Sequence, residues 1–311
     1  MELTNRADLD AAGDSWPPLP LAEWQPTYHN LHMWTQMVGK VRLALTDLTN
    51  HWWNVPLYVN ARGLTSSAIP YRGLAFEMQF DFCEHKFRID RSDGAHVEMG
   101  LVPCTVAEFY AEFLLLLRSL GIEVSIHSKP VEVADPIPFR EDRLYRAYDR
   151  EAAERLRRIL LSCSTVFEHF RAGFVGKNSP VHFFWGSFDL AVTRFSGRRA
   201  PERPGADAIT REAYSHEVIS AGWWPGGNGV DGPAFYCYAA PEPAGLRSSR
   251  IRPGAAYYDE RLGEFLLMYD RVRTMASPED YLLEFLQSTY ESAAELAGWN
   301  RIELERRSAA A

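Results

Sequence analysis

Two long segments of the chain carry hydrophobic residues at the three- and four-residue spacing that is typical of one helix face. These segments are residues 27–47 and 149–171. Two further helices are indicated by their start signals: Thr105-Val106-Ala107-Glu108 has the spacing of a capping box, and Ser277-Pro278 places a cap residue before a proline. We therefore predict four main helices, the third of them over 149–171 and the last ending at Gly298.

Alternating apolar and polar residues predict strands between these helices. The predicted strands of the first half are 56–60, 76–82, 87–89 and 95–101, with turns at 83–85 and 92–94. The predicted strands of the second half are 181–195, 214–221 and 234–240, followed by a hairpin over 255–270. A glycine inside a strand often marks a bulge, so we expect one at Gly186.

The order of the predicted elements repeats along the chain. The expected fold class is therefore α+β, with two similar α-β(3-4)-α halves whose antiparallel sheets are flanked by helices. Residues 80–87 and 188–195 both read Phe-Asp-apolar-x-x-x-basic-Phe, which favours an internal duplication. Chance similarity of two amphipathic patterns is the alternative.

The same pattern predicts the division of the chain. Residues 1–26 are rich in proline and are expected to dock on the surface, and residues 27–130 form the first half. Residues 131–148 form a linker rich in proline and charge, and residues 149–300 form the second half. We expect the two halves to make one compact unit.

Composition narrows the class of protein. The net charge of −8 and the pI near 5.6 argue against a nucleic-acid-binding protein, which is usually basic. No apolar stretch approaches the roughly 20 residues of a membrane helix, and the N-terminus lacks the apolar core of a signal peptide. The four cysteines are far apart, as is usual in a reducing compartment. We expect a cytoplasmic protein with no nucleic-acid or membrane partner.

Residues 227–232 match the G-x-G-x-x-G pattern of dinucleotide-binding loops. That use of the pattern needs a strand before it and a helix after it. Here Pro225 precedes the pattern, and Pro233 follows it and leads into a strand. We expect a flexible loop between strands, which could serve as a lid, in place of a cofactor site; the sequence leaves any cofactor unknown.

The best candidates for chemistry are four titratable residues of the second half. The predicted catalytic residues are His182, Asp189, His216 and Glu217. By strict alternation His182 and Asp189 lie on opposite faces, so they share a site only if Gly186 bulges. A metal centre built from these histidines and a carboxylate is conceivable, but no ligand-spacing motif supports it.

A second set of residues is expected to hold a ligand. The polar stripe of His32, Gln36 and Lys40 on the first helix faces either solvent or a polar cleft, and His29 with His32 could also share a metal. Asp81 occupies the place of Asp189 in the proposed repeat, so both carboxylates could approach one site; local ion pairing is the alternative. The predicted ligand-binding residues are His32, Gln36, Lys40, Asp81, Trp185 and Arg194.

Three segments of the chain resemble those of a bacterial family catalogued as domain of unknown function 5996. They are residues 31–36 (Leu-His-Met-Trp-Thr-Gln), residues 177–198 and residues 214–222 (Tyr-Ser-His-Glu-Val-Ile-Ser-Ala-Gly). The resemblance extends from about Trp16 to Trp299. It implies no activity, but it directs attention to these three segments.

The sequence does not define a reaction. Its best functional interpretation is a small-molecule enzyme with hydrolytic or general acid/base chemistry in a polar, aromatic-walled cleft. The alternative is a non-catalytic module that binds a ligand or another protein. An enzyme needs titratable groups that converge, whereas a binder needs only an apolar pocket with a few polar anchors. The sequence does not indicate an oligomeric state.

Overall fold

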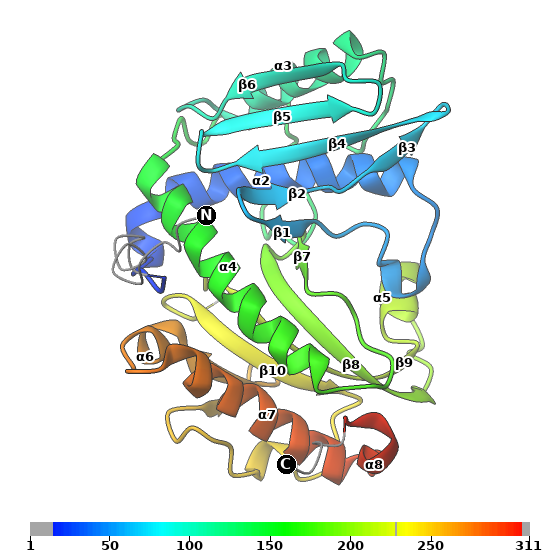
Figure 1. The fold of residues 1–311 in the computed structure, drawn as a ribbon, viewed down its shortest axis with the longest axis vertical. Coiled ribbons are helices and arrows are strands. Elements are labelled where there is room, and N and C mark those ends of the chain that lie inside the picture. The colour runs from blue at the N-terminus through cyan, green and yellow to red at the C-terminus, as the bar shows by residue number, and fades with distance from the viewer. Residues whose placement is uncertain (1–14, 228, 307–311) are drawn as a thin grey trace, which may run out of the picture.

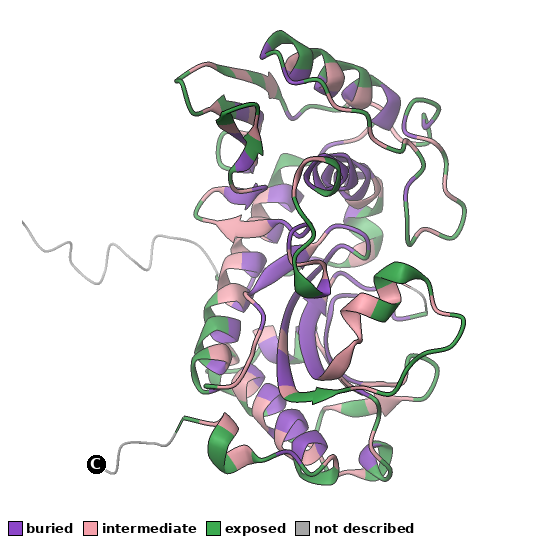
Figure 2. Cartoon of the chain, turned by 90° about the vertical axis from the view of Figure 1, so that its right-hand side faces the viewer, coloured by how far each residue is buried: buried purple, intermediate pink, exposed green. Residues whose placement is uncertain are grey.

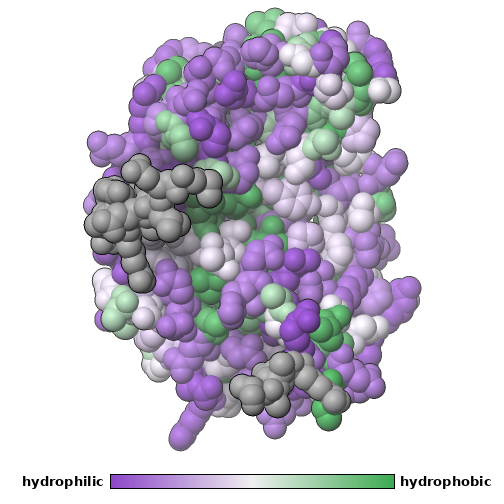
Figure 3. Space-filling model, in the orientation of Figure 1, coloured by the Kyte–Doolittle hydropathy of each residue, from purple (hydrophilic) through white to green (hydrophobic). Residues whose placement is uncertain are grey.

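The computed structural model describes residues 15–227 and 229–306, which form two antiparallel sheets flanked by helices (Figure 1). This arrangement confirms the predicted α+β class. One continuous hydrophobic cluster includes buried residues from both sheets. Figure 3 shows one face of the molecule as mostly hydrophilic, with hydrophobic side chains gathered in patches near its middle.

The first sheet has the strand order β1-β2-β4-β5-β6, and β3 pairs with β4 beside that path. Its strands are β1 (Tyr58–Asn60), β2 (Gly63–Thr65), β3 (Ile69–Tyr71), β4 (Leu74–Asp81), β5 (Lys86–Arg91) and β6 (His96–Gly100). Helices α2 (Leu21–Leu45) and α3 (Val106–Ser119) pack together by stacking Trp34 on Phe109 at 4.3 Å between ring centroids. Phe109 also contacts Phe87 of β5, so the two helices and the sheet share one core.

The second sheet has the strand order β11-β12-β10-β9-β8-β7. Its strands are β7 (His182–Phe184), β8 (Asp189–Arg199), β9 (His216–Trp224), β10 (Ala234–Ala240), β11 (Tyr257–Asp259) and β12 (Glu264–Met268). The long helices α4 (Arg150–Ala172) and α7 (Pro278–Leu296) run across one face of this sheet (Figure 1). The shorter elements are η2 (Asn50–Trp52), α5 (Ala208–Ala213), η3 (Leu246–Ser248), α6 (Tyr269–Arg273) and α8 (Arg301–Leu304).

The two sheets meet at a backbone bridge. Leu57, just before β1, and Phe183 of β7 exchange two backbone hydrogen bonds of 2.9 and 2.7 Å. Both side chains are fully buried. This bridge brings the two sheets side by side along one edge.

Helix α2 is the central element of the molecule. Every residue from Asn30 to Arg42 is buried, and Figure 2 shows this helix almost end-on as a buried coil. The helix begins at Leu21, six residues earlier than predicted, and contains Pro26 in its first two turns. Because it is enclosed on all sides, its polar stripe does not face solvent.

The linker of residues 131–148 has no helix or strand but is packed against the core. Phe139 and Asp142 are fully or almost fully buried there. Of the N-terminal segment predicted to dock, Trp16 and Trp24 are buried, whereas residues 1–14 lie outside the described residues. The linker and the described part of this segment, residues 15–26, are therefore packed against the rest of the protein.

The two Phe-Asp segments do not have the same structure. Phe80 and Asp81 end β4, and the chain turns before β5. Phe188 lies in the turn between β7 and β8 with φ +59°, and β8 starts at Asp189 and continues without a turn. The local sequence match therefore does not make Asp81 and Asp189 equivalent, and the duplication stays a hypothesis.

Candidate functional site

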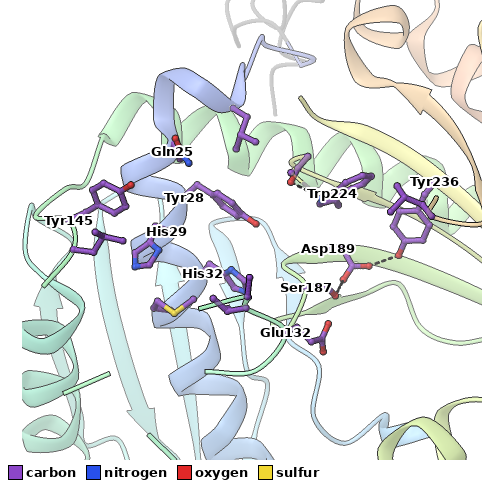
Figure 4. A pocket seen from close by; sticks show the side chains of 18 of the residues that line it. Gln25, Tyr28, His29, His32, Glu132, Tyr145, Ser187, Asp189, Trp224 and Tyr236 are labelled. Atoms are coloured by element: carbon purple, nitrogen blue, oxygen red, sulfur yellow. Dashed lines mark hydrogen bonds between the residues drawn. The ribbon is translucent and has the colours of Figure 1, made fainter. Parts of the chain in front are cut away.

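A cavity of about 690 Å³ lies between α2, the linker and one face of the second sheet. Figure 4 shows its side chains converging from these three parts of the chain. The sheet side is lined by Ser187, Asp189, Trp224, Gly226, Gly227, Tyr236, Tyr238, Leu262 and Glu264. The opposite side is lined by Leu21, Gln25, Tyr28, His29, His32 and Met33 of α2 and by Glu132, Val133, Ala134, Leu144 and Tyr145 of the linker.

Strand register places the polar groups of the sheet on one face. Ala191 of β8 pairs with Gly222 of β9, which in turn pairs with Tyr236 of β10. Residues two apart on a strand share a face, so Asp189 lies on the same face as Tyr236. Gly222 leaves room between them, since a Cβ there would overlap the Tyr236 ring. The Tyr236 ring can therefore lie across β9 and reach Asp189.

Asp189 is the most buried carboxyl of the cavity, with 7% of its surface exposed. The Ser187 hydroxyl donates to its Oδ1 at 2.6 Å, and the Tyr236 hydroxyl donates to its Oδ2. Burial raises the pKa of Asp189, and the two hydroxyl donors act in the opposite direction because they stabilise the ionised form. Both bonds are drawn in Figure 4.

Two more carboxyls share this cavity. Burial and the nearby charges of Asp189 and Asp259 raise the pKa of Glu264 to about 7. Burial and Asp189 also raise the pKa of Glu132. Carboxyls that share a poorly solvated site repel one another when ionised, so the group as a whole retains protons at a higher pH than isolated carboxyls do.

The α2 side of the cavity presents a tyrosine and a neutral histidine. Tyr28 points across the cavity toward Asp189, and burial together with that carboxylate raises its pKa to about 12 (Figure 4). His32 stacks on Tyr28 with a ring separation of 5.8 Å, and its Nε2 donates to the Gly186 carbonyl at 2.7 Å. Burial lowers the pKa of His32 to about 4, so the ring is uncharged at neutral pH.

The linker is held at the cavity by two other members of the α2 stripe. The Gln36 side chain exchanges two 2.9 Å hydrogen bonds with the Val131 backbone, and Lys40 Nζ donates to the Lys129 carbonyl at 3.0 Å. These contacts fix the linker just before Glu132, whose φ of +56° is a costly conformation for a residue with a side chain. The Glu132 carboxylate packs directly on Gly186, where a Cβ would overlap it.

The structure therefore brings two of the predicted site residues, His32 and Asp189, to the cavity, while Gln36 and Lys40 support its wall. Trp185 lies outside the lining and donates to the Val55 carbonyl at 2.9 Å. Arg194 is buried between aromatic rings, with its guanidinium 3.4 Å from the Phe170 centroid.

Asp81 belongs to the other sheet. It forms an ion pair with Arg62 and accepts hydrogen bonds from the backbone N–H groups of Cys83 and Glu84, both at 2.9 Å. The prediction that Asp81 and Asp189 approach one site is therefore wrong, and the local ion-pair alternative is the arrangement observed.

His182 lies in an unexpected place. The segment predicted as one strand with a bulge is a hairpin, in which Phe184 pairs with Asp189 and His182 pairs with Ala191. Paired residues of antiparallel strands share a face, so His182 and Asp189 are on the same face and not on opposite ones. His182 is nevertheless fully buried outside the cavity lining, and neither ring nitrogen has a hydrogen-bond partner among the described residues.

His216 and Glu217 lie at the far end of β9. Trp224, at the other end of β9, lines the cavity. His216 is seven residues away from its neighbour Trp223, which is roughly 20 Å along a strand. It contacts the His51 ring at 5.5 Å, while Glu217 accepts from Ser196 at 2.8 Å and from Arg198. The predicted convergence of His182, His216 and Asp189 therefore does not form.

Several residues of the cavity were not singled out from the sequence. Tyr236 and Glu264 lie on predicted strands, and a glutamate beside the apolar run Phe265-Leu266-Leu267 is a signal that could have identified Glu264. Glu132 lies in an irregular linker, where no periodicity indicates which side chains face inward. Tyr28 precedes the polar stripe by one helical turn and could have been added to it.

The fold and the cavity together define an α+β protein of two antiparallel sheets with an acidic, aromatic-walled pocket beside a buried central helix. The chain belongs to the family of unknown function DUF5996, whose model matches residues 16–306. No match is found among curated proteins or among solved structures.

Two features of the structure bear on the alternatives that the sequence left open. Within residues 15–227 and 229–306, no group of three or more His, Cys, Asp and Glu side chains is arranged to hold a metal ion. Of the helices in the described part of the chain, none has the length and apolar composition needed to cross a bilayer. Asn228, within the G-x-G-x-x-G segment, lies outside the described residues, so the lid interpretation stays a prediction.

Proposed function

We propose that the protein is a small-molecule enzyme that performs general acid–base chemistry in the cavity between α2 and the second sheet. One observation carries this proposal: Asp189, Glu132 and Glu264 share a poorly solvated cavity in which one carboxyl has a pKa of about 7. A general acid or base is most effective when its pKa is near the working pH. Perturbed titratable groups gathered in a cavity are typical of active sites.

The carboxyls would have different roles. Asp189, fixed by the hydroxyls of Ser187 and Tyr236, is the better candidate for the ionised base. Glu264, whose pKa is raised to about 7, is the better candidate for the proton donor. Carboxyls in different environments can divide the acid and base roles between them, and hydrolysis is the reaction type that we propose.

A non-catalytic binding pocket is the second candidate. A cavity of about 690 Å³ lined largely by aromatic and aliphatic side chains is also within the range of simple ligand sites. The two functions differ in what the carboxyls must do: a binder needs their charge, whereas an enzyme needs their proton exchange.

The test is a screen of the purified protein against a panel of hydrolase substrates. Any activity found is then measured in variants of the protein. We expect Asp189→Asn and Glu264→Gln each to lower the rate by about 10²-fold or more, and we expect the wild-type rate to fall as the pH rises through about 7. The matched control is Glu260→Gln, which changes an exposed carboxyl on the same hairpin. An activity that survives both cavity variants would contradict the proposal.

The cytoplasm is the proposed location. Cys83, Cys104, Cys163 and Cys237 are all unpaired, and two of them are buried. Free thiols of this kind are usual in reducing compartments, which supports the proposal.

A further inference from the structure

The carboxyls of the cavity lack the partners that other buried acids of this chain have. Asp81 is fully buried and forms an ion pair with Arg62, and the almost fully buried Asp142 is within hydrogen-bond distance of His29 Nε2 at 2.9 Å. Among the described residues, no ion pair involves Glu132, Asp189 or Glu264, and no lysine or arginine lines the cavity. A buried carboxylate without a cation is costly, so the chain leaves a net negative site unneutralised.

The histidines of the lining do not supply this charge. Burial lowers the pKa of His32 to about 4, and its Nε2–H is directed to the Gly186 carbonyl. His29 is engaged with Asp142. The nearest arginine on the hairpin, Arg261, is held by Asp259 at 3.1 Å. An anionic ligand would therefore meet three carboxyls here, whereas a cation would meet no lysine or arginine among the lining residues.

The walls of the cavity also favour a cation. Tyr28, Tyr145, Trp224, Tyr236 and Tyr238 line it, and aromatic faces attract ammonium groups through their negative π surface. Burial keeps the Tyr28 hydroxyl neutral, because its pKa is raised to about 12. In Figure 4, Trp224 lies above Asp189 and Tyr28 points toward it from α2, so a ligand seated between them would touch rings as well as the carboxylate.

We propose that this cavity binds a small organic cation, a protonated amine carried on an aromatic or alkyl frame, with its nitrogen at Asp189, Glu132 and Glu264. The proposal rests on the proposed function to the extent that this amine would be the substrate. The volume of about 690 Å³ accommodates a molecule larger than a simple ammonium ion. The frame would lie against the aromatic walls while the nitrogen replaces the missing cation.

Binding of a cation should be linked to proton release. The titratable and charged groups that face Glu264 are Asp189 from β8, Asp259 from β11, and Tyr236 and Cys237 from β10, with Arg261 already engaged by Asp259. A cation favours the ionised form of Glu264. The affinity for an amine should therefore rise about tenfold from about pH 6 to pH 8.

The experiment compares matched probes that share one frame and differ in charge. Calorimetry would measure the binding of 2-phenylethylamine, 2-phenylethanol and phenylacetate to the wild-type protein, and of the corresponding butyl amine, alcohol and acid. We expect each amine to bind about tenfold or more tightly than its alcohol, and the acids to bind more weakly still. Glu264→Gln should weaken amine binding and remove its pH dependence, whereas Glu260→Gln should change neither.

Two binding results would contradict the proposal of a cationic ligand. If the alcohols or the acids bind as tightly as the amines, or if neither amine binds at millimolar concentration, the assignment of a cationic ligand is wrong. The outcome is separable from that of the proposed function. Amine binding together with no activity in the hydrolase substrate panel would support the ligand class and contradict the enzyme. If the protein turns over a neutral or anionic substrate and this activity requires Asp189 and Glu264, the enzyme is supported and the cationic ligand class is contradicted.

Discussion

Burial shifts the pKa values of several side chains of this chain in the direction that favours their neutral forms. It raises the pKa of Asp189 and Glu264, and it lowers the pKa of His32 to about 4 and that of His182 to about 3. Of these four residues, His182 lies outside the cavity lining, and both of its nitrogens lack a hydrogen-bond partner among the described residues. It is therefore a structural histidine whose protonation is incompatible with its surroundings.

The first prediction concerns His182→Leu. The folded-state pKa lies below the unfolded value, so the contribution of the neutral ring to stability is complete above about pH 6.5 and is lost as the pH falls toward 3. Between pH 7 and pH 5 the free energy of unfolding of the wild type should drop by about 2 kcal/mol more than that of the variant. At pH 7 the variant should be as stable as the wild type or more stable, because two unsatisfied nitrogens are removed.

Urea unfolding at the two pH values measures this difference. The exposed His96 offers a matched control, and His96→Leu should leave the acid sensitivity unchanged. An equal loss of stability on acidification in the wild type and in His182→Leu would contradict the assigned burial of this ring.

At the scale of elements, the cavity depends on how closely three strands of the second sheet approach. Gly222 of β9 lies between Leu190 of β8 and the Tyr236 ring of β10, and a Cβ there would overlap both the Leu190 carbonyl and the ring. The Tyr236 hydroxyl can reach Asp189 only because this position has no side chain.

The second prediction follows from that contact. Gly222→Ala should displace Tyr236 and separate β8 from β9, which lowers the free energy of unfolding by about 1–3 kcal/mol. The control is Gly232→Ala, because a Cβ at Gly232 meets nothing within 4 Å. Thermal unfolding of both variants measures the effect, and equal melting temperatures for the two variants would disagree with the packing described here.

Elements with a clear local pattern could be predicted from the sequence. The capping box of Thr105 and Glu108 forms as expected, and β10 has the predicted bounds of 234 to 240. The segment 181–195 was predicted incorrectly because alternation continues through the turn, where Phe188 adopts a positive φ that no sequence signal indicates. The burial of α2 was also missed, since polar residues such as Gln36 and Lys40 find partners in the distant linker.

At the scale of the whole molecule, the candidate site is assembled from parts of the chain that are far apart. Glu132 comes from the linker, Asp189 from the start of β8 and Glu264 from the hairpin that ends in β12. His32 and Asp189 could be predicted as candidates because each is a polar residue within the apolar pattern of a regular helix or strand. That these two residues lie in one cavity with Glu132 and Glu264 could not be predicted, because it depends on tertiary packing around α2 and not on any local spacing.

The central claim is that these three carboxyls share one cavity and hold a proton near neutral pH. The most direct test is a carbon-13 NMR titration of the wild-type protein labelled at glutamate side-chain carboxyls, with Glu264→Gln used to assign the resonance. We predict that the Glu264 carboxyl titrates with a pKa of about 7, and that Asp189→Asn lowers that pKa because one of the charges that raises it is removed. A Glu264 carboxyl that titrates at the ordinary glutamate value in both proteins would show that the three carboxyls do not share a proton in this cavity.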